Sequence, residues 1–380
     1  SLQPMYTNTT QYLRALASDL VHGCRRTAAD GTVIYTPDGT ASYDGLWLRD
    51  FSYMVEYAGF AIPDQDIVNC IRYAVRHRRA DRVTTDGLAV YAAGIAAAPV
   101  GEANLDNTPF LIFTVDSLSR RMDTDAFLPL FTEWEAVLEQ GLFLLPLEEN
   151  GLVYNDVQTP HSPYGFTDTI GKTGTLYMES LLYWRACRMM ERMCKTYGVG
   201  NPDHFAEAAE AVERSLSLLF DPAAGAFYAA TKDCHQYDIW GMAYMLYIGF
   251  PCSADEKQAV LSFLEKNYDA CVYRGQVRHL LKGQYWERLL IDVEPETYQN
   301  GAYWATASGW MIWCLAQQNP ALAVRALEDV VSCFKTDGSF ECINEGYEKL
   351  PLFVVSATNV CGGFERTISD FPEFGAGKIG

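Results

Sequence analysis

Residues 242–248 read Met-Ala-Tyr-Met-Leu-Tyr-Ile and residues 310–315 read Trp-Met-Ile-Trp-Cys-Leu, so neither stretch contains a strongly polar side chain. Each lies in a longer segment whose apolar residues have helical spacing, and a helix that is hydrophobic on every side is buried. Other helical segments carry charge on one face, as with Glu207, Glu210 and Glu213, and such a face turns toward solvent. The sequence therefore contains two kinds of helix, one buried and one partly exposed.

The two kinds alternate along the chain. Apolar spacing predicts twelve helices, at about residues 9–28, 48–60, 64–79, 107–122, 124–144, 172–197, 202–220, 236–248, 253–268, 301–317, 320–334 and 356–368. Six buried helices inside six amphipathic ones describe an all-α fold, an (α/α)6 toroid of six helical hairpins. Short β-hairpins are expected in the loops, near residues 33–35, 152–154 and 226–229. Because no linker rich in Gly, Ser or Pro interrupts the sequence, we expect residues 1–380 to form a single domain.

Composition excludes several classes of protein. The 380 residues include 29 Lys and Arg against 48 Asp and Glu, a net charge of −19, and 49% of residues are hydrophobic. This hydrophobic content excludes global disorder. An acidic chain is a poor partner for nucleic acid, which needs clustered Lys and Arg. No apolar run approaches the ~18 residues that a membrane-spanning helix requires, so we expect no membrane partner.

The cysteines and histidines favour a reducing compartment and argue against a metal site. None of the eleven cysteines is in a C-x-x-C pair, and Cys187 and Cys194 would lie about 10 Å apart on a helix, too far for a disulfide. The six histidines form neither an H-x-H nor an H-E-x-x-H motif. Residues 1–5 lack the basic and apolar regions of a signal peptide. We therefore expect a cytoplasmic protein without a bound metal.

The segments that lead into the buried helices share an unusual composition. In an (α/α)6 toroid these segments converge at one end of the axis, where helix N-termini offer unpaired N–H groups to a polar ligand. They mix Asp, Asn or Glu with Tyr or Trp, except that residues 102–107 contain no aromatic residue. The segments are residues 43–50, 102–107, 161–169, 235–240, 298–304 and 344–349. Aromatic faces stack on the C–H surfaces of sugars while carboxylates and amides bind hydroxyls. This end of the toroid is therefore predicted to hold a carbohydrate pocket.

Three short motifs in these segments make the prediction more specific. They are Trp47-Leu48-Arg49-Asp50, then Tyr298-Gln299-Asn300-Gly301 followed by Trp304, and Asn344-Glu345-Gly346-Tyr347. Together they resemble the six-hairpin glycosidase superfamily, which includes trehalases, mannosyl-oligosaccharide glucosidases, glucoamylases and bacterial exo-α-mannosidases. The resemblance extends as a pattern over nearly the whole chain. This chain differs in being short, with no N-terminal β-sandwich. The resemblance implies a glycoside hydrolase that needs no cofactor and no catalytic metal.

The resemblance also implies roles for individual residues. Asp50 corresponds to the residue that binds the terminal sugar, and Asp168, in Gly165-Phe166-Thr167-Asp168, to the general acid. Glu345 corresponds to the general base. Its alternative reading is a solvated loop carboxylate, with Glu341 or Glu348 as the base. Asp168 has an alternative reading as the N-cap of the sixth helix, because Asp is a favoured N-cap residue.

The remaining candidates are aromatic, acidic, amide and basic residues of the same segments. We predict a substrate-binding set made of Trp47, Arg49, Asp50, Asp106, Asp238, Trp240, Gln299, Asn300 and Trp304. Arg49 and Asp50 have an alternative as an internal ion pair, although a charged pair that opens a buried helix needs a partner or a ligand. Trp240 and Trp304 have an alternative as core aromatics.

The sequence as a whole is interpreted as an exo-acting, inverting glycoside hydrolase. Asp168, kept protonated in a partly desolvated site, would protonate the leaving oxygen, and ionised Glu345 would activate water on the opposite sugar face. Trp47, Asp50, Asp168, Asp238, Asn300 and Glu345 should then face one cavity. One alternative is a phosphorylase or uronyl hydrolase on the same barrel, although a phosphorylase needs a cationic phosphate pocket. Another is a non-catalytic carbohydrate-binding or prenyltransferase-like helical scaffold, and the missing zinc ligand set argues against the prenyltransferase.

Overall fold

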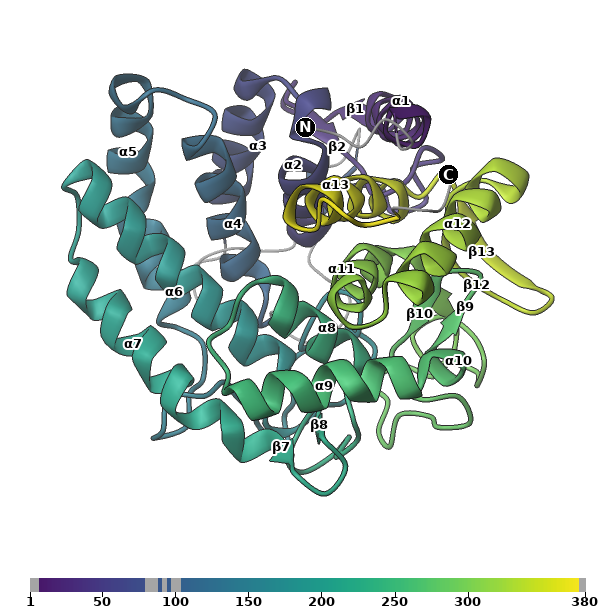
Figure 1. Cartoon of the computed structure of the whole chain (residues 1–380). Coiled ribbons are helices and arrows are strands. Elements are labelled where there is room, and N and C mark those ends of the chain that lie inside the picture. The colour runs from purple at the N-terminus through teal and green to yellow at the C-terminus, as the bar shows by residue number, and fades with distance from the viewer. Residues whose placement is uncertain (1–6, 79–87, 91–93, 97–103, 376–380) are drawn as a thin grey trace.

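The computed structural model describes residues 7–78, 88–90, 94–96 and 104–375, and its long helices form an inner and an outer ring (Figure 1). The inner ring consists of α2 (Leu48–Ala58), α4 (Asn107–Ser119), α6 (Met178–Tyr197), α8 (Ile239–Tyr247), α11 (Ser308–Gln318) and α13 (Val354–Asp370). The outer ring consists of α1 (Thr7–Gly23), α3 (Asp64–Arg76), α5 (Thr124–Leu142), α7 (Pro202–Ser215), α9 (Ala254–Lys266) and α12 (Pro320–Asp337).

The inner ring is closed. Each inner helix packs against the next inner helix along the chain, and α13 returns to pack against α2. Two glycines allow α11 and α13 to approach closely, since a Cβ added to Gly363 would lie 2.5 Å from the Cα of Gly309. The predicted (α/α)6 toroid of six helical hairpins is therefore confirmed.

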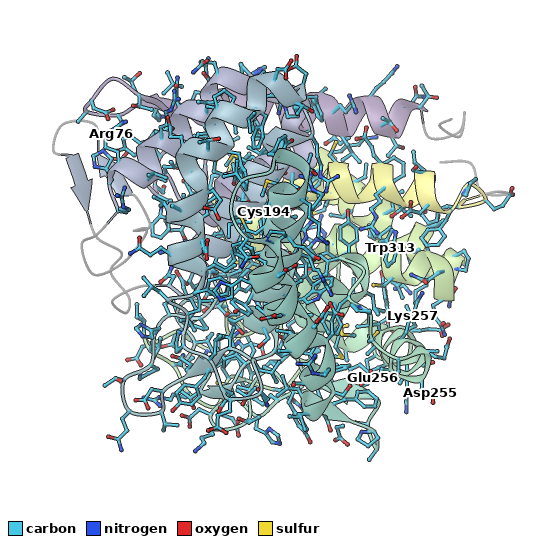
Figure 2. All side chains as sticks on the ribbon, turned by 90° about the vertical axis from the view of Figure 1, so that its left-hand side faces the viewer. Arg76, Cys194, Asp255, Glu256, Lys257 and Trp313 are labelled. Atoms are coloured by element: carbon cyan, nitrogen blue, oxygen red, sulfur yellow. The ribbon has the colours of Figure 1, made fainter. Side chains whose placement is uncertain are left out.

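Burial follows the predicted alternation. Every residue of the inner helix α8 is buried. On the outer helix α9, Asp255 and Lys257 are exposed, and Figure 2 shows both at the edge of the molecule. Helix α9 begins with a capping box, in which the Ser253 side chain accepts from the Glu256 N–H and the Glu256 side chain accepts from the Ser253 N–H.

Several inner helices begin later than predicted. Helix α6 begins at Met178 instead of residue 172, and α11 begins at Ser308 instead of residue 301. The residues before α6 form β6 (Gly174–Thr175), and those before α11 form β11 (Tyr303–Trp304) and the 3-10 turn η4 (Ala305–Ala307). Apolar residues near a helix start can also pair as short strands, which helical spacing does not distinguish. On the outer ring, α3 ends at Arg76, while residue 79, its predicted end, lies outside the described residues.

Short hairpins occupy several loops. The hairpins that are separate from the five-stranded sheet described below are β1 (Arg25–Thr27) with β2 (Val33–Tyr35), β3 (Leu88–Val90) with β4 (Gly94–Ala96), β5 (Tyr154–Asn155) with β6, and β7 (Phe220–Asp221) with β8 (Ala226–Phe227). The expected hairpin strands near residues 33–35 and 226–229 therefore correspond to β2 and β8, and the one near 152–154 is shifted to β5. Shorter helical pieces are η2 (Gly59–Ala61), η3 (Leu216–Leu219) and α10 (Tyr268–Cys271).

A five-stranded antiparallel sheet is the main feature that helical spacing does not predict. Its order is β13-β12-β11-β10-β9, and the strands are β9 (Val272–Tyr273), β10 (Gln276–Arg278), β11, β12 (Phe340–Asn344) and β13 (Tyr347–Pro351). Strands β12 and β13 form a hairpin in which Asn344 pairs with Tyr347, so that Glu345 and Gly346 make the turn. This hairpin precedes α13 and decides which acidic side chain can reach the interior.

The cysteines are free thiols, and all but Cys252 are buried. Among the described helices, none combines the length and apolar character that a membrane span requires. No group of three or more His, Cys, Asp or Glu side chains suited to a metal ion occurs in the described part of the chain.

Candidate active site

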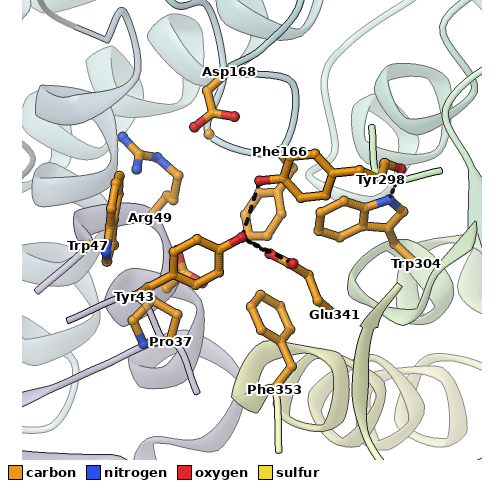
Figure 3. Close-up of a pocket in the computed structure, with 12 residues that line it drawn as sticks. Pro37, Tyr43, Trp47, Arg49, Phe166, Asp168, Tyr298, Trp304, Glu341 and Phe353 are labelled. Carbon is orange, nitrogen blue, oxygen red and sulfur yellow. Dashed lines mark hydrogen bonds between the residues drawn. The ribbon is translucent and has the colours of Figure 1, made fainter. Parts of the chain in front are cut away.

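A pocket opens where the segments before the inner helices converge (Figure 3). The lining residues are aromatic or acidic, apart from one arginine, one proline and one glycine. They are Pro37, Tyr43, Trp47, Arg49, Asp50, Gly165, Phe166, Asp168, Tyr298, Trp304, Glu341 and Phe353. These residues come from the loop before α2, the start of α2, the loop before β6, the residues around β11, strand β12 and the start of α13. Of the six segments expected to converge here, residues 43–50, 161–169 and 298–304 contribute to the lining, whereas residues 102–107, 235–240 and 344–349 do not.

Arg49 is fixed by an acid from another loop. Its side chain is 2% exposed, and its Nε lies 3.1 Å from Asp106 Oδ2 while its Nη2 lies 3.2 Å from Asp106 Oδ1 and 3.0 Å from Asn107 Oδ1. Asp106 Oδ2 also accepts a hydrogen bond of 2.6 Å from the Gly165 N–H. Asp106 thus joins three segments of the chain, and it does not line the pocket. Arg49 thus has an internal carboxylate partner, and that partner is Asp106, whereas the alternative reading paired Arg49 with Asp50.

Gly165 makes room for the Arg49 side chain. A Cβ added to Gly165 would lie 1.4 Å from Arg49 Cδ and 2.0 Å from Arg49 Nε. No side chain fits at this position unless Arg49 moves. The small residue in the loop is therefore required by the path of the guanidinium to Asp106.

We expect Gly165→Ala to damage the pocket strongly. The displaced Arg49 would lose its bidentate partner, and overpacking of this kind costs about 1–3 kcal/mol of stability. A misplacement of about 1 Å in a site can lower turnover about a hundredfold, so kcat/KM should fall by about that factor together with the melting temperature. Gly23→Ala is the matched control, because nothing lies within 4 Å of a Cβ added there. Equal kcat/KM and equal melting temperatures in Gly165→Ala and Gly23→Ala would contradict the conclusion that Arg49 needs the space at Gly165.

Asp168 is held by an amide. Its Oδ1 accepts a hydrogen bond of 2.7 Å from Gln299 Nε2, and Gln299 Oε1 accepts from the Thr169 N–H at 3.0 Å and from Thr169 Oγ1 at 2.5 Å. The N-cap of α6 is Tyr177. The alternative that Asp168 caps the sixth helix is therefore wrong. Gln299 positions Asp168 from outside the pocket lining.

Among the described residues, Glu341 is the glutamate that lines the pocket. It is 3% exposed on β12, and its carboxylate accepts from Lys349 Nζ at 2.6 Å and from the Tyr43 hydroxyl at 2.8 Å. Burial raises the pKa of Glu341, and the charge and hydrogen bond of Lys349 oppose that rise. Tyr43 Oη also lies 3.3 Å from the Tyr298 hydroxyl, which extends the polar cluster.

Glu345 lies outside the pocket, contrary to our expectation that it faces the cavity. It is exposed in the turn between β12 and β13, where its N–H donates to Asn344 Oδ1. Glu348, the other alternative, is exposed on β13. The physical reason is the hairpin: a two-residue turn projects into solvent, whereas Glu341, four residues earlier on the strand, points inward (Figure 3).

Asp50 adds a third carboxyl to the pocket. Burial is the main cause that raises its pKa to about 8, the nearby Glu341 and Asp168 raise it further, and Arg49 opposes them. A pKa raised in this way favours the protonated form of Asp50 at neutral pH. A protonated carboxyl can both donate a hydrogen bond to a ligand oxygen and accept one.

The other predicted residues fall into two groups. Trp47, Arg49, Asp50 and Trp304 line the pocket, as expected. Asp106, Asp238, Trp240, Gln299 and Asn300 do not belong to the lining.

The second group has structural partners. Asp238 caps α8, accepting from the Gly241 N–H at 2.9 Å, and Trp240 is buried with its Nε1 donating to the Val277 carbonyl. The Asn300 side chain accepts from the Trp286 N–H at 2.9 Å. Trp240 is thus a core aromatic, as the alternative reading proposed. The expectation that Asp238 and Asn300 face the cavity is not met, because their oxygens are used by backbone N–H groups.

A buried ion pair near Asp238 was not foreseen. Lys172 Nζ lies 2.7 Å from Glu179 Oε2, with both side chains 1% exposed, and it ties the loop before β6 to helix α6. Burial raises the pKa of Asp238, and the charge of Lys172 opposes the rise.

Four aromatic lining residues were not among the predicted site residues, namely Tyr43, Phe166, Tyr298 and Phe353. The first three belong to the segments that the sequence analysis singled out.

No protein-family model matches the sequence, and no curated protein is similar to it. Solved structures do share its fold. A GH63 mannosylglycerate hydrolase from Thermus thermophilus in complex with glucose has a TM-score of 0.67 at 14% identity, over 93% of this chain and 100% of that chain. A rhamnosidase from Klebsiella oxytoca with rhamnose bound has a TM-score of 0.66 at 12% identity, over 97% and 66%. A structure described as a glycosidase with a single substitution has a TM-score of 0.65 at 12% identity, over 98% and 99%. The chain therefore has the (α/α)6 fold of these glycoside hydrolases.

Proposed function

We propose that this protein is an exo-acting, inverting glycoside hydrolase in which Asp168 is the general acid and Glu341 the general base. The observation that carries the proposal is the placement of these two carboxyl groups, which point into one pocket from opposite sides (Figure 3). Glycosidases use such a pair, one group to protonate the leaving oxygen and the other to activate water. Glu341 takes the role that the sequence suggested for Glu345.

The walls of the pocket support a carbohydrate substrate. Trp47, Phe166, Trp304 and Phe353 supply aromatic faces. The buried Trp47 Nε1 has no acceptor among the described residues, so it can donate to a sugar hydroxyl. The similar structures were solved with glucose and with rhamnose bound, which is consistent with a monosaccharide in this pocket.

The surroundings of Glu341 support its role. Lys349 and Tyr43 bind the Glu341 carboxylate, which favours the ionised form that a general base needs. Gln299 fixes one carboxylate oxygen of Asp168 by a hydrogen bond. In an inverting enzyme the two groups are about 6.5–9.5 Å apart, against about 5 Å in a retaining one, and groups on opposite sides of a pocket favour the wider separation.

The enclosure of the pocket supports exo-action. Its lining residues come from the segments before α2, α6 and α11, from β12 and from the start of α13, and a pocket walled by several segments admits a single terminal sugar more readily than the middle of a polymer. One hydrophobic cluster runs from Leu13 to Phe374, which supports the proposal that residues 1–380 act as one catalytic domain. Such a reaction requires neither an organic cofactor nor a metal.

Two other functions receive less support. A phosphorylase needs cations for phosphate, whereas Arg49, the cation among the described lining residues, is bound by Asp106, and Lys349, outside the lining, is bound by Glu341. A non-catalytic scaffold needs only one well-placed carboxylate, whereas three share this pocket.

The test is a screen of aryl α- and β-glycosides and short oligosaccharides, followed by proton NMR of the sugar released. We expect hydrolysis of one class of terminal sugar, with the first-formed anomer opposite to that of the substrate. Retention of configuration would contradict the inverting mechanism. Release of sugar 1-phosphate only in the presence of phosphate would favour the phosphorylase.

A further inference from the structure

A lysine outside the pocket lining contacts Glu341. Lys349 belongs to β13, where its Cα pairs with that of Cys342 on β12. Its Nζ lies 2.6 Å from Glu341 Oε1 and 3.0 Å from the Tyr43 hydroxyl, and 4.4 Å from the centre of the Tyr298 ring. Three contacts of this kind fix the ammonium group in one place.

Lys349 is not a residue of the pocket lining, and one third of its side chain (34%) is exposed. A sugar in the pocket would therefore meet Glu341 and not Lys349. Any effect of Lys349 on a bound sugar must pass through the Glu341 carboxylate or the Tyr43 hydroxyl.

Most other ionisable groups around Glu341 are acidic or neutral. Asp50 faces it from α2 and Asp168 from the loop before β6, and buried Asp38 lies on the loop after β2. Tyr43, Tyr298 and Cys342 are the neighbouring hydroxyl and thiol groups, and burial raises the pKa of each. Arg49, the cation of the pocket lining, is bound to Asp106. In the part of the chain that the structure describes, Lys349 is thus the cation in direct contact with Glu341.

We infer that Lys349 is a positioning residue whose ammonium group keeps Glu341 ionised and oriented as the base of the reaction. This inference rests on the proposed function. In the step concerned, the Glu341 carboxylate takes one proton from water while the water oxygen bonds to the anomeric carbon. The glycosidic C–O bond breaks as Asp168 delivers its proton to the leaving oxygen, so that water is consumed and two hydroxyl products form.

The first test is the pH dependence of kcat/KM in Lys349→Met and Lys349→Arg. The base works only when ionised, and an adjacent opposite charge lowers a carboxyl pKa by about 1–3 units. Loss of the ammonium in Lys349→Met should therefore move the acid limb of the profile upward by about that amount, with KM little changed. Lys349→Arg retains the charge and should keep the acid limb near its original position.

The matched control is Lys335→Met on α12, where the ammonium lies 4.9 Å from the ring of Tyr12. It loses the same charge and a similar contact with a tyrosine ring, so its pH profile should stay unchanged. Lys349→Gln provides a second neutral variant, and thermal unfolding shows whether each variant is folded. A superimposable acid limb in wild type and both folded neutral variants would overturn the inference.

A direct titration separates this inference from the proposed function. With 13C-labelled glutamate side chains, the Glu341 signal can be identified by its absence in Glu341→Gln. It should titrate at higher pH in Lys349→Met than in wild type, whether or not a glycoside is hydrolysed. An unchanged titration would overturn the role of Lys349. A shifted titration in a protein that cleaves no glycoside would overturn the proposed function and leave the ionising role of Lys349 supported.

Discussion

Glu341→Gln is expected to lower kcat about 10²–10⁴-fold on every substrate that the protein cleaves, the range for loss of a general base. Glutamine keeps the shape of the side chain and can still accept from Tyr43 and Lys349, but it cannot remove a proton from water. Because attack by water is impaired whatever group departs, aryl glycosides with good leaving groups and oligosaccharides should suffer alike. Steady-state kinetics on one substrate of each kind measures the effect.

Glu345→Gln is the matched control for this prediction. It makes the same chemical change four residues later, on an exposed turn, and should leave kcat and KM within about twofold of wild type, as surface substitutions usually do. Azide offers a second check, because this anion needs no deprotonation and should restore product formation in Glu341→Gln. If Glu345→Gln lost activity and Glu341→Gln retained it, Glu345, the residue that the sequence suggested, would be the base.

Local sequence patterns do not distinguish Glu341 from Glu345 as the base. Asn344-Glu345-Gly346-Tyr347 has the polar character of a segment that enters a helix, and it also suits a two-residue turn, where Gly346 adopts a positive φ of 69°. The strand before it has five residues, too few for period-2 alternation to outweigh a helical pattern. Its partner β11 lies far away in the sequence, so the sheet depends on pairing that local spacing does not reveal.

The ring of helices was predictable because it depends on local patterns. A helix that is apolar on all sides can only be interior, and the alternation of such helices with charged ones determines the two rings. The general location of the pocket was predictable for a similar reason, since the segments before the inner helices must meet at one end.

The individual contacts were not predictable in the same way. Asp106 and Asp168 are both loop acids beside a polar residue, and the sequence suggested a substrate or catalytic role for each. In the structure Asp106 is used by Arg49 and the Gly165 N–H, whereas Asp168 reaches the pocket. The difference arises from partners more than fifty residues away in the sequence. Asp238 and Asn300 were misassigned for the same reason.

The fall in kcat caused by Asp168→Asn should depend on the leaving group of the substrate. Asparagine keeps an acceptor for Gln299 Nε2, so the pocket should retain its shape, but it has no proton to give. A poor leaving group such as a sugar alkoxide needs that proton in the transition state, and its kcat should fall about 10²–10⁴-fold. A nitrophenolate departs without protonation, so hydrolysis of the corresponding aryl glycoside should be largely spared.

The measurement is a series of aryl glycosides whose leaving phenols span several pKa units, compared in wild type and Asp168→Asn. The slope of log kcat against leaving-group pKa should become steeper and more negative in the variant, because the bond then breaks without help from an acid. Asp255→Asn, an exposed position on α9, is the control and should keep the wild-type slope. An equal loss along the whole series would mean that Asp168 acts on water or on the sugar itself, and Asp50, whose raised pKa favours the protonated form at neutral pH, would then be the stronger candidate for the acid.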